Sequence, residues 1–168
     1  NRNAGMVDVY ISLGSNVERE LNIRKALGCL KTRFGSLCCS SVYESEAFGF
    51  SGNPFLNLVT RFETNASVYD VSRGLKDIEA SCGRRREGPR YSPRTLDLDL
   101  LLFGSLVIRE NGLQVPRDEV TERAFVLKPL AEVAGDVVHP TLGRSFKDLW
   151  VAFDLGAQDL IPIELELF

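Results

Sequence analysis

Two aspartates interrupt an otherwise apolar run, and this pattern constrains the fold of the chain more than any other. Residues 96–100 read Leu-Asp-Leu-Asp-Leu, and two further leucines and Phe103 follow. In a β-strand successive side chains point to opposite faces, so the alternate leucines take one face while Asp97 and Asp99 take the other. The segment therefore predicts a half-buried strand that presents two carboxylates, roughly 6.5 Å apart along the backbone, to one site.

An arginine-rich segment precedes this strand and indicates what its carboxylates face. Arg84, Arg85 and Arg86 are consecutive, and Arg90 and Arg94 follow. Carboxylates that hold metal ions, together with guanidinium groups that bind phosphate oxygens, suit a metal-bound polyphosphate. Structural salt bridges between these groups, or a solvated basic surface with weak affinity for nucleic acid, are the alternatives.

Strand-like and helical patterns alternate along the chain. Strands are expected at residues 7–13, 37–45, 55–64 and 96–103. Apolar residues at helical spacing predict helices ending near Phe34 and Cys82, the second with Ser67 as its N-cap. The order β-α-β-β-α-β predicts an α+β fold of the ferredoxin-like plan, in which helices cover one face of an antiparallel sheet. Short strands near residues 106–108 and 113–115 and helical turns near 125–134 and 145–153 follow.

Length and composition fit a single globular domain. The chain has 168 residues, a net charge of −3 and 44% hydrophobic residues, which is enough to bury a substantial core. We expect residues 6–168 to form this domain and residues 1–5, which precede the only methionine, to be an added tail. No apolar run is long enough for a membrane span, and the negative net charge argues against a nucleic-acid partner. We expect a cytoplasmic monomer or weak dimer with reduced cysteines.

Several separated motifs resemble those of the 6-hydroxymethyl-7,8-dihydropterin pyrophosphokinase family, which acts in folate synthesis. Residues 93–99, followed by residues 102–104, resemble the family signature. The other matching segments follow the family's order: residues 11–16, 43–45 with Gly49, 55–57, 123–127 with 129–130, and 139–140. The resemblance implies transfer of pyrophosphate from ATP to the hydroxymethyl group of the reduced pterin, which gives AMP and the pterin diphosphate.

The resemblance also implies roles for residues on the nucleotide side. Asp97 and Asp99 match the aspartates that hold two magnesium ions, and Arg84 and Arg94 match arginines that bind the phosphates, so these four are the expected catalytic residues. The expected nucleotide-binding positions are Glu79, Arg84, Arg86, Tyr91, Arg94, Leu100, Arg117 and Arg123. For Glu79, a solvated helix face is the alternative reading.

On the pterin side, the resemblance implies contacts to the ring edge and to both ring faces. Asn57 offers a carbonyl acceptor and an amide donor for the edge, and Ser45 matches a second contact there. Phe55 and Phe125 match an aromatic pair that stacks on the ring, where offset stacking contributes about 1 kcal/mol beyond area burial. Phe48 completes the expected substrate-binding set.

Arg117 departs from the family pattern, which usually has a histidine in this segment. An arginine supplies a permanent cation, so we expect an Arg117→His substitution to be tolerated. The same departure is compatible with a related magnesium-ATP pyrophosphokinase that acts on a different pterin or acceptor. A non-catalytic ferredoxin-like module that binds RNA through sheet aromatics, and a homologue without activity, are the remaining alternatives.

Overall fold

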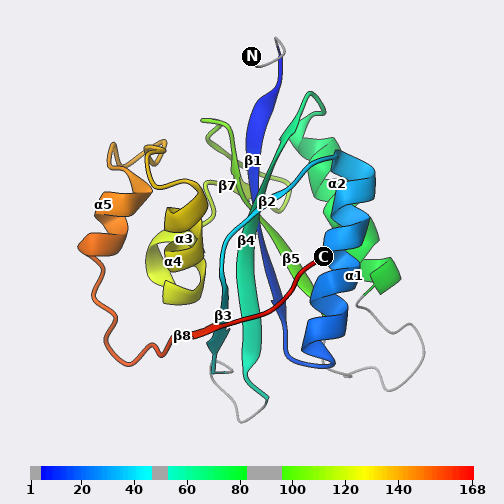
Figure 1. The fold of residues 1–168 in the computed structure, drawn as a ribbon. Coiled ribbons are helices and arrows are strands. Elements are labelled where there is room, and N and C mark those ends of the chain that lie inside the picture. The colour runs from blue at the N-terminus through cyan, green and yellow to red at the C-terminus, as the bar shows by residue number, and fades with distance from the viewer. Residues whose placement is uncertain (1–4, 47–52, 83–95) are drawn as a thin grey trace.

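The computed structural model describes residues 5–46, 53–82 and 96–168, which form a mixed α+β fold around an antiparallel sheet (Figure 1). The strands are β1 (Val7–Ser15), β2 (Cys38–Cys39), β3 (Val42–Ser45), β4 (Phe55–Thr64), β5 (Asp97–Phe103), β6 (Ile108–Glu110), β7 (Leu113–Val115) and β8 (Ile161–Ile163). The helices are α1 (Arg19–Phe34), α2 (Val68–Cys82), α3 (Glu119–Glu122), α4 (Ala124–Val133) and α5 (Phe146–Val151). The main sheet follows the path β5-β1-β4-β3-β8, with β2 also on β4, and β6 and β7 form a separate hairpin.

Local sequence signals mark the start of α2 and the end of α1. The Ser67 hydroxyl accepts a hydrogen bond from the Asp70 backbone N–H at 3.1 Å, as an N-cap does. Gly35 ends α1 with a φ of 93°, a conformation that glycine adopts without the steric cost of a Cβ. No helix in the described parts of the chain has the length and apolar character needed to cross a membrane.

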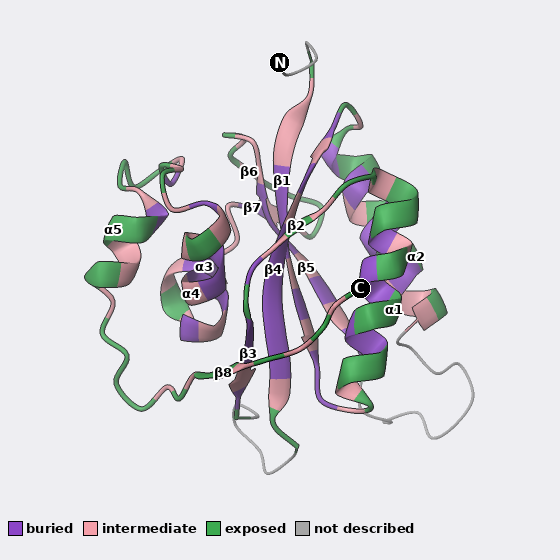
Figure 2. Cartoon of the chain, in the orientation of Figure 1, coloured by how far each residue is buried: buried purple, intermediate pink, exposed green. Residues whose placement is uncertain are grey.

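The two faces of the sheet pack against different helices because side chains alternate along β1. Val9, Ile11 and Leu13 face α1 and α2 and are at most 1% exposed. Tyr10 lies on the opposite face, where it packs in a second cluster with Val59 and residues of α4. Figure 1 shows α1 and α2 on one side of the sheet and α3, α4 and α5 on the other, and Figure 2 shows that β4 between them is buried along most of its length. The helices thus form two layers rather than one, because the chain after β7 folds back over the second face.

A β-bulge divides the β1–β5 pairing into two parts. Tyr10 pairs with Leu102 and Ile11 pairs with Leu100, so Leu101 is the extra residue on β5. The bulge lets Leu101 and Leu102 both pack into the cluster with α4, where they are at most 1% exposed. The second sheet face is therefore apolar beside this cluster and becomes polar further along β5.

The strand expected at residues 37–45 is broken into β2 and β3 by a side-chain hydrogen bond. The Ser40 backbone N–H donates to the Val59 carbonyl at 2.8 Å, while the Val59 N–H donates to the Ser40 hydroxyl at 2.9 Å. The hydroxyl thus replaces a backbone acceptor of the ladder. Beyond the break, the Glu132 carboxylate of α4 accepts hydrogen bonds from the Ser41 N–H and the Tyr43 hydroxyl, which ties β3 to the second layer.

Two cysteine thiols meet where α1 packs against α2. The sulfurs of Cys29 and Cys82 lie 3.0 Å apart, and both residues are free thiols. The hydrogen bond with Cys82, together with burial, raises the pKa of the Cys29 thiol from 9.0 to about 11. Both effects favour the neutral thiol over the reactive thiolate.

Cys29 should therefore react slowly with iodoacetamide in the folded protein. A rise of two pKa units leaves about 100-fold less thiolate at pH 8, so exposed Cys38 should be alkylated first, as peptide mass spectrometry would show. A Cys82→Ala variant should accelerate labelling of Cys29, and denaturation should bring the two rates together. Equal labelling of Cys29 and Cys38 in native buffer would contradict this assignment.

Candidate functional site

Helix α4 does not cover the polar part of the second sheet face. This part lines a cavity of about 280 Å³. Strand β1 lies at its centre and sets the positions of the side chains on both neighbours. Gly14 lies opposite Asn57 of β4 and also opposite Asp97 of β5, and Ser12 lies opposite Asp99. Residues directly opposite one another in antiparallel pairs share a face, so one side of the sheet collects an amide, a hydroxyl and two carboxylates.

The Asn57 amide is buried and held in one orientation. Its Nδ2 donates to the Ser45 hydroxyl at 2.7 Å, and longer contacts of 3.4 and 3.5 Å reach the carbonyls of Tyr43 and Phe55. These acceptors use the amide hydrogens, so the carbonyl Oδ1 remains to accept hydrogen bonds from a ligand. Asn57 and Ser45 are only 5% and 6% exposed, which makes this a fixed polar group rather than a mobile surface amide.

Aromatic side chains from two elements line the same cavity. Phe55 is the first residue of β4, and Phe125 lies in the first turn of α4. Leu101 and Val126 add apolar surface. Apolar walls with a few fixed polar groups suit a flat ligand that has polar atoms along one edge.

A second cavity of about 660 Å³ lies beyond the β5 edge, between α2 and the β6–β7 hairpin. Leu98 and Leu100 of β5 supply apolar surface, and Arg73 and Lys76 of α2 supply positive charge. Glu79 also lines it, and its carboxylate accepts a hydrogen bond from the Leu98 N–H at 3.0 Å. The Glu79 side chain is thus anchored on the sheet, where it ties the end of α2 to the start of β5.

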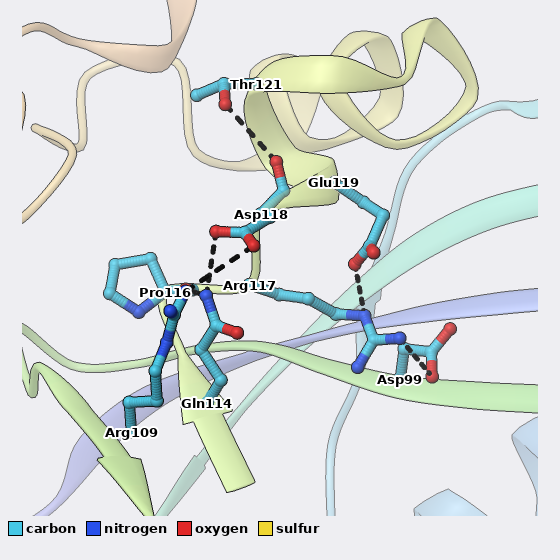
Figure 3. Close-up of polar contacts among 8 residues, drawn as sticks. All are labelled: Asp99, Arg109, Gln114, Pro116, Arg117, Asp118, Glu119 and Thr121. Carbon is cyan, nitrogen blue, oxygen red and sulfur yellow. Dashed lines mark hydrogen bonds and ion pairs between the residues drawn. The ribbon is translucent and has the colours of Figure 1, made fainter. Parts of the chain in front are cut away.

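The two cavities share Asp99 and Arg117. The Arg117 Nη2 lies 3.5 Å from Oδ1 of Asp99, and its Nε pairs with the Glu119 carboxylate. Figure 3 shows the guanidinium group between these two carboxylates. The Arg117 backbone N–H donates to the Leu101 carbonyl at 3.0 Å, which fixes this segment against β5. A ligand in either cavity can therefore reach the same charged groups.

Asp97 and Asp99 are the candidate metal ligands, because they lie on one face of β5 and alternate with buried leucines. Within the described ranges, no group of three or more histidine, cysteine, aspartate or glutamate side chains gathers closely enough to hold an ion, at this strand or at any other place. Two carboxylates fit magnesium, which completes its octahedral shell with water and substrate phosphates. Structural zinc and calcium sites need more protein ligands than this strand offers.

The structure brings together most of the expected site residues that it describes. Those lining the smaller cavity are Ser45, Phe55, Asn57, Asp97, Asp99, Arg117 and Phe125, and those lining the larger cavity include Glu79, Leu100 and Arg117. Arg123 is instead the residue that precedes α4 and lines neither of these cavities. Five expected residues lie outside the described ranges: Phe48, Arg84, Arg86, Tyr91 and Arg94.

Sequence reasoning assigned no site role to Ser12, Gly14 or Glu119, which also line the smaller cavity. Gly14 carried a usable signal, because a glycine inside a strand pattern often marks the close approach of another group. Glu119 carried no such signal in the sequence. Its contact with Arg117 depends on the turn after β7, which has no strand-like or helical periodicity.

Sequence comparisons assign the chain to a family. A family model described as 7,8-dihydro-6-hydroxymethylpterin-pyrophosphokinase matches residues 10–135. The 2-amino-4-hydroxy-6-hydroxymethyldihydropteridine pyrophosphokinase of Aquifex aeolicus is 37% identical over 146 residues, which cover 85% of this chain and 90% of the relative. The protein of the same name from Pseudomonas aeruginosa is 38% identical over 160 residues, which cover 92% of this chain and 96% of the relative.

A comparison with solved structures supports the fold. Wild-type Plasmodium falciparum HPPK-DHPS superposes with a TM-score of 0.68 over 90% of this chain, at 13% identity. The match covers only 45% of that longer chain, so the likeness concerns the fold of one part of it. The family model and the two bacterial relatives show that the chain belongs to the 7,8-dihydro-6-hydroxymethylpterin-pyrophosphokinase family.

Proposed function

We infer that this chain transfers the pyrophosphoryl group of ATP to the hydroxymethyl group of 6-hydroxymethyl-7,8-dihydropterin, giving AMP and the pterin diphosphate. Family membership and the names of both bacterial relatives support this reaction. The geometric observation that carries the inference is that two cavities of different size meet at Asp99 and Arg117. A transfer between two substrates needs such a meeting point, because the attacking oxygen and the reacting phosphorus must be brought into contact.

We propose that the pterin occupies the smaller cavity. The Asn57 carbonyl oxygen would accept hydrogen bonds from N–H groups on the pyrimidine-like edge of the ring, with Ser45 fixing the amide. Phe55 and Phe125 would cover the ring faces. Gly14 of β1 lies between Asn57 of β4 and Asp97 of β5. A ring anchored at Asn57 would therefore direct its opposite end toward the aspartates.

We propose that ATP occupies the larger cavity. Its apolar surface at Leu98 and Leu100 suits an adenine ring, and Lys76 provides a cation for the ribose-phosphate part. The polyphosphate would then extend to Arg117, where the two cavities meet. Arg84 and Arg94, which lie outside the described residues, stay predicted phosphate ligands on the strength of the family resemblance.

We propose that Asp97 and Asp99 hold magnesium during the reaction, and the predicted number of two ions stays an expectation from the sequence. Magnesium at this position would supply charge neutralisation for the polyphosphate and polarise the reacting phosphoryl group. The protein's own contribution is positioning. Asn57 fixes the acceptor, the aromatic walls exclude water around it, and the Arg117 guanidinium provides a permanent positive charge for the developing phosphate charge.

We also propose that the strands and the first two helices form a ferredoxin-like core within a single domain. Support comes from the order β5-β1-β4-β3, in which all neighbouring strands are antiparallel, and from the position of α1 and α2 on one face. The second helical layer and the β6–β7 hairpin would then be additions that build the site.

Substituting asparagine for Asp97 or Asp99 should abolish turnover and leave the fold intact. Loss of a metal-binding charge should lower kcat by at least about 1,000-fold, whereas the melting temperature should change little because both side chains lie at the open end of β5. The measurement is pterin-dependent release of AMP from ATP and magnesium, with formation of the pterin diphosphate. Asp77→Asn, an exposed carboxylate on α2, is the matched control.

Near-normal turnover of either site variant would show that these carboxylates do not hold the reacting metal. AMP release by the unmodified chain that does not depend on the pterin would point to another acceptor.

A methyl group at Gly14 should weaken pterin binding selectively. An added Cβ would lie 3.3 Å from the Asn57 Oδ1 and 3.8 Å from the Phe55 ring, so Gly14→Ala disturbs the recognition group and the cavity floor together. Impairing one hydrogen bond costs about 1 kcal/mol, so the pterin KM should rise at least fivefold while the ATP KM stays nearly constant. Gly28→Ala is the control, because a Cβ there meets no atom within 4 Å. An unchanged pterin KM would place the pterin elsewhere.

A further inference from the structure

A guanidinium group lies against one of the two carboxylates that would hold the metal. The Arg117 Nη2 is 3.5 Å from Oδ1 of Asp99, and on its other side the Arg117 Nε pairs with Glu119. A guanidinium group carries a delocalised positive charge and offers hydrogen-bond donors but no acceptor. A divalent cation that approaches Asp99 must therefore compete with a cation that belongs to the protein.

The turn that carries Arg117 is held in place by contacts of the next residue, Asp118. The Asp118 carboxylate accepts a hydrogen bond from the Gln114 Nε2 at 2.7 Å and lies 3.6 Å from the Arg109 guanidinium, while the Thr121 hydroxyl donates to the Asp118 carbonyl at 3.2 Å (Figure 3). The Arg117 side chain is 39% exposed and, among the described residues, pairs with the carboxylates of Asp99 and Glu119. The turn can thus stay in place while the guanidinium changes its partner.

Incoming polyphosphate offers the guanidinium a better partner than Asp99. Phosphate oxygens accept paired hydrogen bonds from an arginine fork, and they carry more charge than one carboxylate. Because Arg117 lines both cavities, a nucleotide in the larger one comes within its reach. Movement of the guanidinium onto phosphate would take this positive charge away from Asp99 as the metal arrives with the nucleotide.

We propose that Arg117 is the counter-ion of Asp99 in the nucleotide-free enzyme, and that it makes metal binding at Asp97 and Asp99 depend on the nucleotide. Glu119 retains the Nε side of the guanidinium, so the exchange needs only the Nη2 side to move from carboxylate to phosphate. This inference rests on the proposed function, because it takes ATP as the ligand that displaces the pair.

The test measures manganese binding to the nucleotide-free protein by calorimetry or electron paramagnetic resonance. Arg117→Gln should bind Mn²⁺ on the order of tenfold more tightly than the unmodified chain, because a unit positive charge beside the site has been removed. Arg117→Lys, which keeps the charge, should stay close to the unmodified chain. Arg109→Gln is the matched control, since it removes the same charge from an arginine that contacts Asp118 instead of Asp99.

A double variant ties the gained affinity to the proposed position. Asp99→Asn in the Arg117→Gln background should abolish the gain. The proposal is overturned if Arg117→Gln binds Mn²⁺ no better than the unmodified chain, if Arg109→Gln tightens binding equally, or if the double variant keeps the gain. Pterin-dependent AMP formation by the unmodified chain is a separate readout. If the unmodified chain forms AMP but Arg117→Gln binds Mn²⁺ with unchanged affinity, the counter-ion proposal is wrong and the proposed function still holds.

Discussion

The register of β1 between β4 and β5 is the constraint on which the rest of the structure depends. Ile11 and Leu13 face the two long helices and close the main core, whereas Ser12 and Gly14, one residue out of phase, face the smaller cavity. The same pairing places Asn57 and Asp97 on either side of Gly14. A slip of one residue would expose Ile11 and Leu13 and bury the polar groups, so the core fixes the geometry of the site.

One part of the second sheet face packs against α4, and another part carries the polar groups of the candidate site. Beside the β-bulge at Leu101, α4 covers apolar side chains and contributes Phe125 to the cavity wall. Further along β5 the helix leaves Asp97 and Asp99 partly open to solvent. Carboxylates buried without partners would cost several kcal/mol, and here Asp97 and Asp99 are only partly buried while Arg117 forms an ion pair with Asp99.

Sequence patterns predicted the features that depend on short-range periodicity. The alternation around Asp97 located β5 and the face of its carboxylates, and Ser67 marked the start of α2. The antiparallel sheet and the mixed α+β class followed from the order of these segments. Such patterns describe one strand or helix at a time. They therefore predicted how the two aspartates lie relative to each other and to the leucines of the same strand.

Features that depend on tertiary contacts escaped prediction. The break between β2 and β3 needs the Ser40 hydroxyl to meet Val59 on another strand. Strand β8 is only three residues long and becomes a strand by pairing with β3, while the pair of Arg117 with Glu119 forms in a turn that has no period. The second helical layer over Tyr10 likewise depends on how the chain returns after β7.

The central claim is that each substrate has its own cavity and that the two meet at Asp99. A crystal structure with magnesium, a non-hydrolysable ATP analogue and 6-hydroxymethyl-7,8-dihydropterin tests it most directly. The account predicts the pterin over Gly14 with its edge on Asn57, the adenine beside Leu98, and the polyphosphate at Asp97 and Asp99 with Arg117 turned onto it. A pterin bound beyond the β5 edge, or a polyphosphate that does not reach Asp99, would contradict it.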